Sequence, residues 1–187
     1  MGKGVQVGLN DLHYALLTKD DETGVTYSAP VKVSGAITAK ITPKSNSETL
    51  FADDGPAEIA TALGEIDVEL ETKDLDLSTQ AALLGHTVTA GVIMKKASDN
   101  APYVALGFKS KKSNGKYRYV WLFKGKFMPP DQEYATQEDK PKFQTPTIKG
   151  SFIRRDNDLA WQVVGDEDET GFTEGATWFD SVYGTVV

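Results

Sequence analysis

Two segments of the chain alternate apolar and polar residues with a period of two, and this alternation most constrains the fold. In residues 31–42 the apolar positions are Val31, Val33, Ile37, Ala39 and Ile41. In residues 65–71 they are Ile66, Val68 and Leu70. Successive side chains of a strand point to opposite faces of a sheet, so a period of two predicts strands with one buried face. Sheets with one buried face and one wet face are typical of antiparallel β-structure.

Between these two segments lie residues 43–63, in which neither a strand nor a secure helix pattern is visible. Neighbouring strands are usually joined by about two to five residues, and structureless loops beyond about 12–15 residues are uncommon unless functional or disordered. The segment is polar, but Leu50 and Phe51 lie near its centre and Asp53-Asp54-Gly55-Pro56 follows. We therefore expect a long loop that reaches and contacts another molecule.

The second half of the chain opens with a hairpin signal, Ser113-Asn114-Gly115-Lys116, between two strand-like runs. Asn-Gly suits a two-residue type I′ turn, because both central positions need a positive φ. A turn closed there pairs Phe108 with Trp121 and Leu106 with Phe123, which predicts an aromatic core cluster on one face of the hairpin.

The remaining patterns complete a mainly β fold. Residues 77–84 predict a helix, with Asp76 or Ser78 as its N-cap and Gly85 at its end. Residues 175–182 predict a second, short helix, residues 9–18 are interpreted mostly as a strand, and residues 147–163 as a further strand pair. We expect about seven strands in one domain over residues 1–187, arranged as an antiparallel β-sandwich or barrel with a flanking helix.

Composition and motifs argue against an enzyme. The chain has no cysteine and only two histidines, His13 and His86. His13 follows Asp11 but no serine in a nucleophile-elbow context completes a triad, and no glycine-rich phosphate loop is present. We therefore predict no catalytic residue, no cofactor and no metal site, and no run is apolar enough to span a membrane. The lack of cysteine indicates synthesis in a reducing cytoplasm.

The net charge of −7 is distributed unevenly along the chain. Residues 1–100 carry a net charge of −7, residues 101–160 a net charge of +6, and residues 161–187 a net charge of −6. Either the blocks are chance distributions over solvated faces, or copies associate head to tail through basic and acidic surfaces. An acidic chain repels phosphate, which disfavours specific nucleic-acid binding.

One strand carries a row of carboxylates on a single face: Glu65, Asp67, Glu69 and Glu71. Such like charges require a wet face or pairing with lysines, such as Lys40, on a neighbouring strand. The row is consistent with a plain solvated sheet face or with the wall of a water-filled channel that must not adhere to a polyanion.

Four blocks of sequence, in their combined order and spacing, resemble the major tail proteins (tail-tube proteins) of long, non-contractile-tailed phages and prophages of Gram-positive bacteria. The blocks are VGLNDLHYALLT (7–18), ADDGPAEIATALGEIDVELE (52–71), APYVALGFKSKKSNGKYRYVWLFKGKF (101–127) and FQTPTIKGSFIRR (143–155). The resemblance covers most of the chain, and after Val164 only the acidic character matches.

The resemblance implies a β-sandwich or barrel with a flanking helix, a fold shared with type VI secretion tube proteins. Members of this family self-assemble into hexameric rings, and the rings stack into a tube through which DNA is ejected without specific binding. By this resemblance residues 43–63 form an inter-ring loop, residues 1–18 a first strand or N-terminal arm, and residues 165–187 an acidic C-terminal arm. The implied inter-ring contacts are Leu50, Phe51, Asp53, Asp54 and Pro56. The implied lumen face consists of Glu65, Asp67, Glu69 and Glu71.

The implied partners are further copies of the chain and other tail proteins, namely the tape measure, tail terminator and distal tail proteins, with no membrane partner. The implied location is the virion tail, after synthesis in the host bacterial cytoplasm. Two alternatives stay open: a secretion-system tube protein of the same fold, and a carbohydrate-binding β-sandwich that uses Trp161, Trp178 or exposed tyrosines.

Overall fold

The computed structural model describes residues 3–52, 55–132 and 145–185. Along the chain its elements are β1 (Gln6–Asp21), β2 (Gly24–Tyr27), β3 (Val31–Val33), β4 (Ala36–Ala52), β5 (Gly55–Thr72), α1 (Leu77–Leu84), β6 (Thr87–Thr89), β7 (Val92–Met94), β8 (Val104–Lys112), β9 (Tyr117–Phe127), β10 (Thr147–Ile153), β11 (Gln162–Asp166) and a 3-10 turn, η1 (Glu174–Ala176). These described ranges are mainly β, with antiparallel sheets as the alternating patterns predict, and they contain one α-helix. The described residues contain eleven strands rather than about seven.

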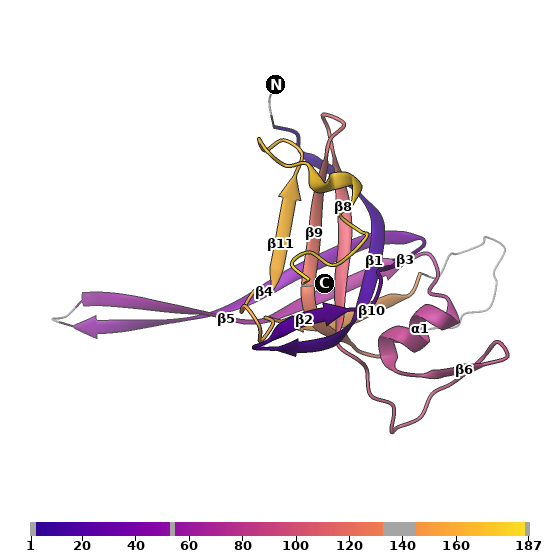
Figure 1. Cartoon of the computed structure of the whole chain (residues 1–187). Helices are drawn as coiled ribbons and strands as arrows, with labels where there is room; N and C mark the ends of the chain where they lie inside the picture. The colour runs from indigo at the N-terminus through magenta and orange to yellow at the C-terminus, as the bar shows by residue number, and fades with distance from the viewer. Residues whose placement is uncertain (1–2, 53–54, 133–144, 186–187) are drawn as a thin grey trace, which may run out of the picture.

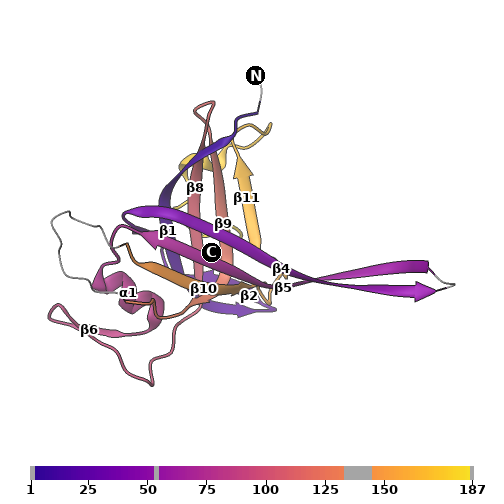
Figure 2. The same cartoon turned by 180° about the vertical axis from the view of Figure 1, so that it is seen from behind.

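One large sheet bends over itself to form two layers. Its strand order is β2-β1-β8-β9-β10-β5-β4, and β9 branches so that residues 118–122 pair with β11 and residues 124–127 pair with β10. As a result β8, β9 and β11 form one layer, and β4, β5 and β10 cross it as a second layer (Figures 1 and 2). The main core lies between these layers, and its fully buried members include Ile66, Val68, Leu106, Leu122, Ile148 and Phe152.

A second core lies on the opposite face of β8 and β9. There Trp121 and Phe123 are buried against Trp178 and Val182 of the C-terminal segment, and the Trp121 indole donates a hydrogen bond to the Trp178 carbonyl at 3.1 Å. Figure 1 shows this segment, in yellow, folded over the layer of β8 and β9. The described part of residues 165–187, expected to form a C-terminal arm, is therefore packed against the rest of the same chain.

The predicted second helix over residues 175–182 is also wrong, since the described chain has only the 3-10 turn η1 there. Thr173 precedes this turn without a capping hydrogen bond from its side chain. The large side chains that follow are committed to the second core, because Trp178 is 4% exposed and Val182 is 1% exposed. Packing of these residues therefore takes precedence over local helix formation.

The hairpin of β8 and β9 forms at the predicted place but in a register shifted by one residue. Leu106 pairs with Leu122, and Phe108 pairs with Val120. The register is shifted because the loop has three residues rather than two. A 2.8 Å hydrogen bond from the Lys112 amide to the Lys116 carbonyl closes this loop. Gly115 takes a φ of +86°, as expected for the last position of a three-residue hairpin loop. A one-residue shift moves side chains to opposite faces, so the predicted aromatic pairing is wrong. Both faces of the hairpin are buried.

The helix α1 confirms its prediction at both ends. The Asp76 side chain accepts a 2.8 Å hydrogen bond from the Thr79 amide, which satisfies one of the free N–H groups of the first turn. Gly85 ends the helix with a φ of +74°, in the left-handed region. Leu83 and Leu84 bury the inner side of the helix against the main core.

Replacing Gly107 with alanine should destabilise the fold, because the Trp121 indole lies over this glycine. A Cβ atom at Gly107 would lie 2.6 Å from two ring carbons of Trp121, which is fully buried and cannot move away freely. We expect a loss of about 2 kcal/mol in the free energy of unfolding, in the range typical of overpacked cores. Chemical denaturation measures it. Gly8→Ala is the control, since a Cβ there meets nothing within 4 Å. Equal stability of the two variants would contradict this packing.

Candidate functional site: assembly surfaces

Residues 43–63 form most of a long β-ribbon rather than the predicted irregular loop. Strand residues 45–52 pair with residues 55–63, from Ser45 opposite Leu63 to Ala52 opposite Gly55. In the described chain these residues have no other strand partner, and both views show the ribbon projecting from the body (Figures 1 and 2). We call residues 45–52 and 55–63 the β4–β5 arm.

The predicted contact residues fall at the outer end of the β4–β5 arm. Leu50 pairs with Glu58, and Phe51 pairs with Pro56 after a register shift. Asp53 and Asp54, also predicted contacts, lie outside the described residues. The structure thus places Leu50, Phe51 and Pro56 together at the far end of the ribbon.

The acidic row lies on the exposed face of β5, as its alternation predicts. The intervening residues Ile66 and Val68 are fully buried, whereas the side chains of Glu65 and Asp67 are 51% and 45% exposed. Lys44 of β4 reaches both of them, with its Nζ 2.6 Å from Glu65 Oε1 and 3.0 Å from Asp67 Oδ2. The hydrogen bond from Lys44 lowers the pKa of Glu65.

The other end of the row is paired more loosely. Lys40, named above as a possible partner of the row, lies opposite Glu69, and its Nζ is 4.0 Å from a Glu69 oxygen. Lys149 of β10 approaches Glu69 from the other side, also at 4.0 Å, and the Thr145 hydroxyl donates to Glu71 at 2.6 Å. Sequence reasoning missed Lys44 because its register depends on a bulge in the pairing of β4 with β5. It missed Lys149 because this residue lies on β10, a strand distant from β5 in the sequence. The face is thus a mixed, wet surface of acids and lysines.

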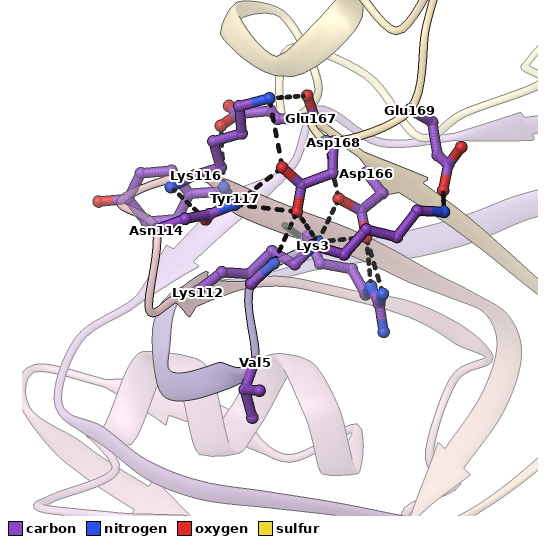
Figure 3. Close-up of polar contacts among 12 residues, drawn as sticks. Lys3, Val5, Lys112, Asn114, Lys116, Tyr117, Asp166, Glu167, Asp168 and Glu169 are labelled. Atoms are coloured by element: carbon purple, nitrogen blue, oxygen red, sulfur yellow. Dashed lines mark hydrogen bonds and ion pairs between the residues drawn. The ribbon is translucent and has the colours of Figure 1, made fainter. Parts of the chain in front are cut away.

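The basic and acidic blocks of the sequence meet inside the subunit, at the tip of the β8–β9 hairpin (Figure 3). Lys112 is 1% exposed, and its Nζ donates to Asp166 Oδ1 at 2.6 Å and to Asp168 Oδ2 at 2.5 Å. Arg118 Nε donates to Asp166 at 2.8 Å. Residues 166–169 are therefore part of an ion cluster within the chain, in which Lys112, Asp166 and Asp168 are already paired.

The same cluster holds the start of the chain. The Gly4 amide donates to Asp168 at 3.2 Å, and the Lys3 ammonium lies 2.5 Å from Glu169 (Figure 3). The Val5 carbonyl accepts a 2.8 Å hydrogen bond from the Ser113 amide. Residues 9–18 are within β1, as predicted, and residues 3–5 are bound to their own subunit.

Replacing Asp166 with asparagine should reduce the acid sensitivity of the fold. Although burial alone would raise the pKa of Asp166, hydrogen bonds from Lys112, the Asp168 amide and Arg118 lower it to about 2. Because this pKa is lower in the folded state than the usual value of about 3.9, the contribution is present above about pH 4 and is lost towards pH 2.

We therefore expect Asp166→Asn to be less stable than the parent at pH 7 and to lose less stability between pH 4 and pH 2. Urea unfolding at pH 7, 4 and 2 measures this difference. Glu174→Gln, at an exposed position, is the control and should follow the parent. A variant with the parent's full pH dependence would contradict the assigned role.

A hollow of about 580 Å³ opens where β1 meets the C-terminal segment. The Asp11 carboxylate at its edge is bound by both Lys32 and Lys109, and His13 Nδ1 lies 2.9 Å from the Asp11 backbone carbonyl oxygen. His13 stacks on Phe179 with ring centroids 4.3 Å apart, and burial lowers its pKa. The described residues that line the hollow include no serine, threonine or cysteine, and the only hydroxyl groups among them belong to Tyr117 and Tyr119.

His86 follows the C-terminal end of α1 and contacts the carboxylate of Asp99. Its side chain is 6% exposed, and its Nδ1 lies 2.7 Å from Asp99 Oδ2. Asp99 also accepts a 2.8 Å hydrogen bond from the Lys96 amide. The pair therefore fixes the loop that follows β7 against the end of the helix.

Neither tryptophan of the carbohydrate alternative forms an exposed platform. Trp178 is 4% exposed, and Trp161 is partly buried against the main core. Over residues 3–52, 55–132 and 145–185 no group of three or more His, Asp or Glu side chains could hold a metal ion. No helix in these ranges is long and apolar enough to cross a membrane.

No protein-family model and no curated protein matches this chain. The geometry of the β4–β5 arm, the charged face and the sheet edge therefore carries the functional argument.

Proposed function

We propose that this chain is a structural virion protein that self-assembles into stacked, hexameric rings and so forms a phage tail tube for DNA ejection. In this proposal the protein is not an enzyme. Its partners are further copies of itself and the tape measure, terminator and distal tail proteins, and DNA passes through the lumen without specific binding.

The β4–β5 arm is the observation that carries the proposal. A two-stranded ribbon is marginally stable by itself in water, because it has no second layer against which to bury apolar side chains. Residues 45–47 and 61–63 are exposed on consecutive positions, so both faces of the ribbon's inner half are open to solvent. Such a ribbon gains most of its stability from a neighbouring molecule, as expected of a subunit that contacts an adjacent ring.

The free edge of the sheet supports ring formation. Strand β4 ends the strand order of the large sheet, and within the described chain its backbone pairs on one side only, with β5. An unpaired strand edge is a template for pairing with another chain. Lateral pairing at this edge would continue the layer of β4, β5 and β10 from one subunit to the next, with its charged face towards a water-filled lumen.

The test is assembly of the purified protein at rising concentration, with and without the other tail components. Sedimentation velocity and negative-stain electron microscopy should show rings or tubes. A strictly monomeric protein under all these conditions would overturn the proposal. Co-assembly with a tape measure and terminator protein, rather than with sheath and baseplate proteins, distinguishes a tail tube from a secretion tube.

A further inference from the structure

We propose that the β4–β5 arm of one copy docks on the β6–β7 hairpin of a second copy, next to Lys95 and Lys96. This inference rests on the proposed self-assembly and adds to it the surface that receives the arm. The occupant is a defined segment of the same chain, recognised through apolar contact and through acidic-to-basic charge complementarity.

The β6–β7 hairpin offers an exposed apolar face. Thr87 pairs with Met94, and Thr89 pairs with Val92, so these four residues share one face of the two-stranded sheet. Val92 is 66% exposed and Met94 is 59% exposed. Like the arm, this small sheet has no further strand partner among the described residues, so one face remains open for a second molecule.

Two lysines follow this face directly and are held in place. Lys95 and Lys96 are exposed, and within the described chain neither forms an ion pair. The buried pair of His86 and Asp99 anchors the Lys96 amide. The Asp99 carboxylate is therefore already bound by His86 and by the Lys96 amide. The side-chain ammonium groups of Lys95 and Lys96 lie on this loop.

The arm has the complementary chemistry. Residues 45–63 contain four acids, Glu48, Asp53, Asp54 and Glu58, and no lysine or arginine. Leu50, Phe51 and Ile59 are interspersed with these acids. An acidic segment with apolar residues is attracted to a basic apolar surface and is repelled by an acidic one.

Other described faces fit the arm less well. In the hollow near His13 both lysines are already bound to Asp11, and Glu167 adds a further carboxylate. The exposed face of β5 carries the acidic row, which would repel the arm. The exposed, basic and apolar face of the β6–β7 hairpin is therefore the better match.

The two surfaces lie at opposite ends of the molecule. The arm projects on one side, and α1 and β6 lie on the other, in both views (Figures 1 and 2). A contact between two different patches is heterologous, and it propagates from copy to copy unless a rotation closes the ring. Docking of arm to hairpin would thus connect successive subunits along a tube.

Site-directed cross-linking tests this assignment, because the chain has no cysteine. In assembled protein, Ala57→Cys combined with Val92→Cys should give a ladder of covalent multimers with a short bis-maleimide. The matched control combines Ala57→Cys with Val164→Cys, another exposed strand valine, 49% exposed, and should give no ladder. Tubes that cross-link through residue 164, or through neither site, would overturn the docking surface while leaving the proposed function intact.

A charge exchange gives a second readout. Lys95→Glu with Lys96→Glu should raise the concentration needed for assembly at least about tenfold, because like charges then face each other. Adding Glu48→Lys and Glu58→Lys should restore assembly in the same chain. Failure of this rescue in variants that remain folded by circular dichroism would count against the contact, and a parent protein that never assembles would remove both proposals.

Discussion

Replacing residues 46–62 with Asn-Gly should leave a folded monomer that no longer forms tubes. Ser45 pairs with Leu63 in the parent, so a two-residue turn between them keeps the register at the base of the arm. The buried residues Ile66 and Val68 of β5 lie beyond the deletion, and shortening a connection costs little or even favours closure. We therefore expect a melting temperature close to the parent's and complete loss of sedimenting assemblies.

The control keeps the length of the arm and replaces only Asp53-Asp54 with Asn-Gly; it should still assemble, because Glu48 and Glu58 remain. Circular dichroism, thermal melting and electron microscopy of the three proteins compare fold and assembly. Collapse of the melting temperature in the short variant would mean that the arm supports its own subunit. Normal tubes from the short variant would exclude the arm from assembly.

The sequence did not predict the strands of the β4–β5 arm, and the reason is physical. Alternation appears where one face of a strand is buried, as for Ile66, Val68 and Leu70, which sequence reasoning placed correctly. Where both faces of a ribbon are exposed, as at residues 45–47 and 61–63, no such constraint acts on the side chains, so the strand pairing leaves no period of two. The length of the segment was the informative signal, whereas its conformation was not predictable from periodicity.

The β8–β9 hairpin shows the limit of turn rules. Asn114-Gly115 predicted the turn correctly, but the three-residue loop shifted the register by one position. The error had a large consequence, since it moved Trp121 from the face of Phe108 to the opposite face. Runs buried on both faces, such as Val120 to Phe123, give no alternation that could correct the register.

The charge pattern was visible in the sequence, but its partners were not. Lys112 and Asp166 are more than 50 residues apart, and the pairing of β9 with both β8 and β11 brings them together. In contrast, Lys40 could be named as a possible partner of the acidic row, because it lies on the adjacent, strongly alternating strand; its position opposite Glu69 came from the structure. The solvent-exposed face was thus recognisable from the sequence, whereas the full set of lysines that pair with it could be identified only from the folded structure.

Reversing the charge of the acidic row should permit assembly but hinder passage of DNA. In the parent, Lys40, Lys44 and Lys149 accompany the four carboxylates. Changing all four carboxylates to lysine would leave a surface with only positive charge. If this face lines the lumen, as proposed, these cations would bind phosphates and release counterions, which holds DNA in the tube.

We expect the lysine variant to lower infectivity by at least about a hundredfold, because many weak phosphate contacts act together along the tube. Changing the same four residues to glutamine is the control for lost ion pairs, and this variant should assemble and eject DNA. Ejection measured in vitro should recover in the lysine variant as salt is raised, since salt weakens phosphate binding. A defect that salt does not relieve would indicate damaged structure, and unchanged ejection would place the row outside the lumen.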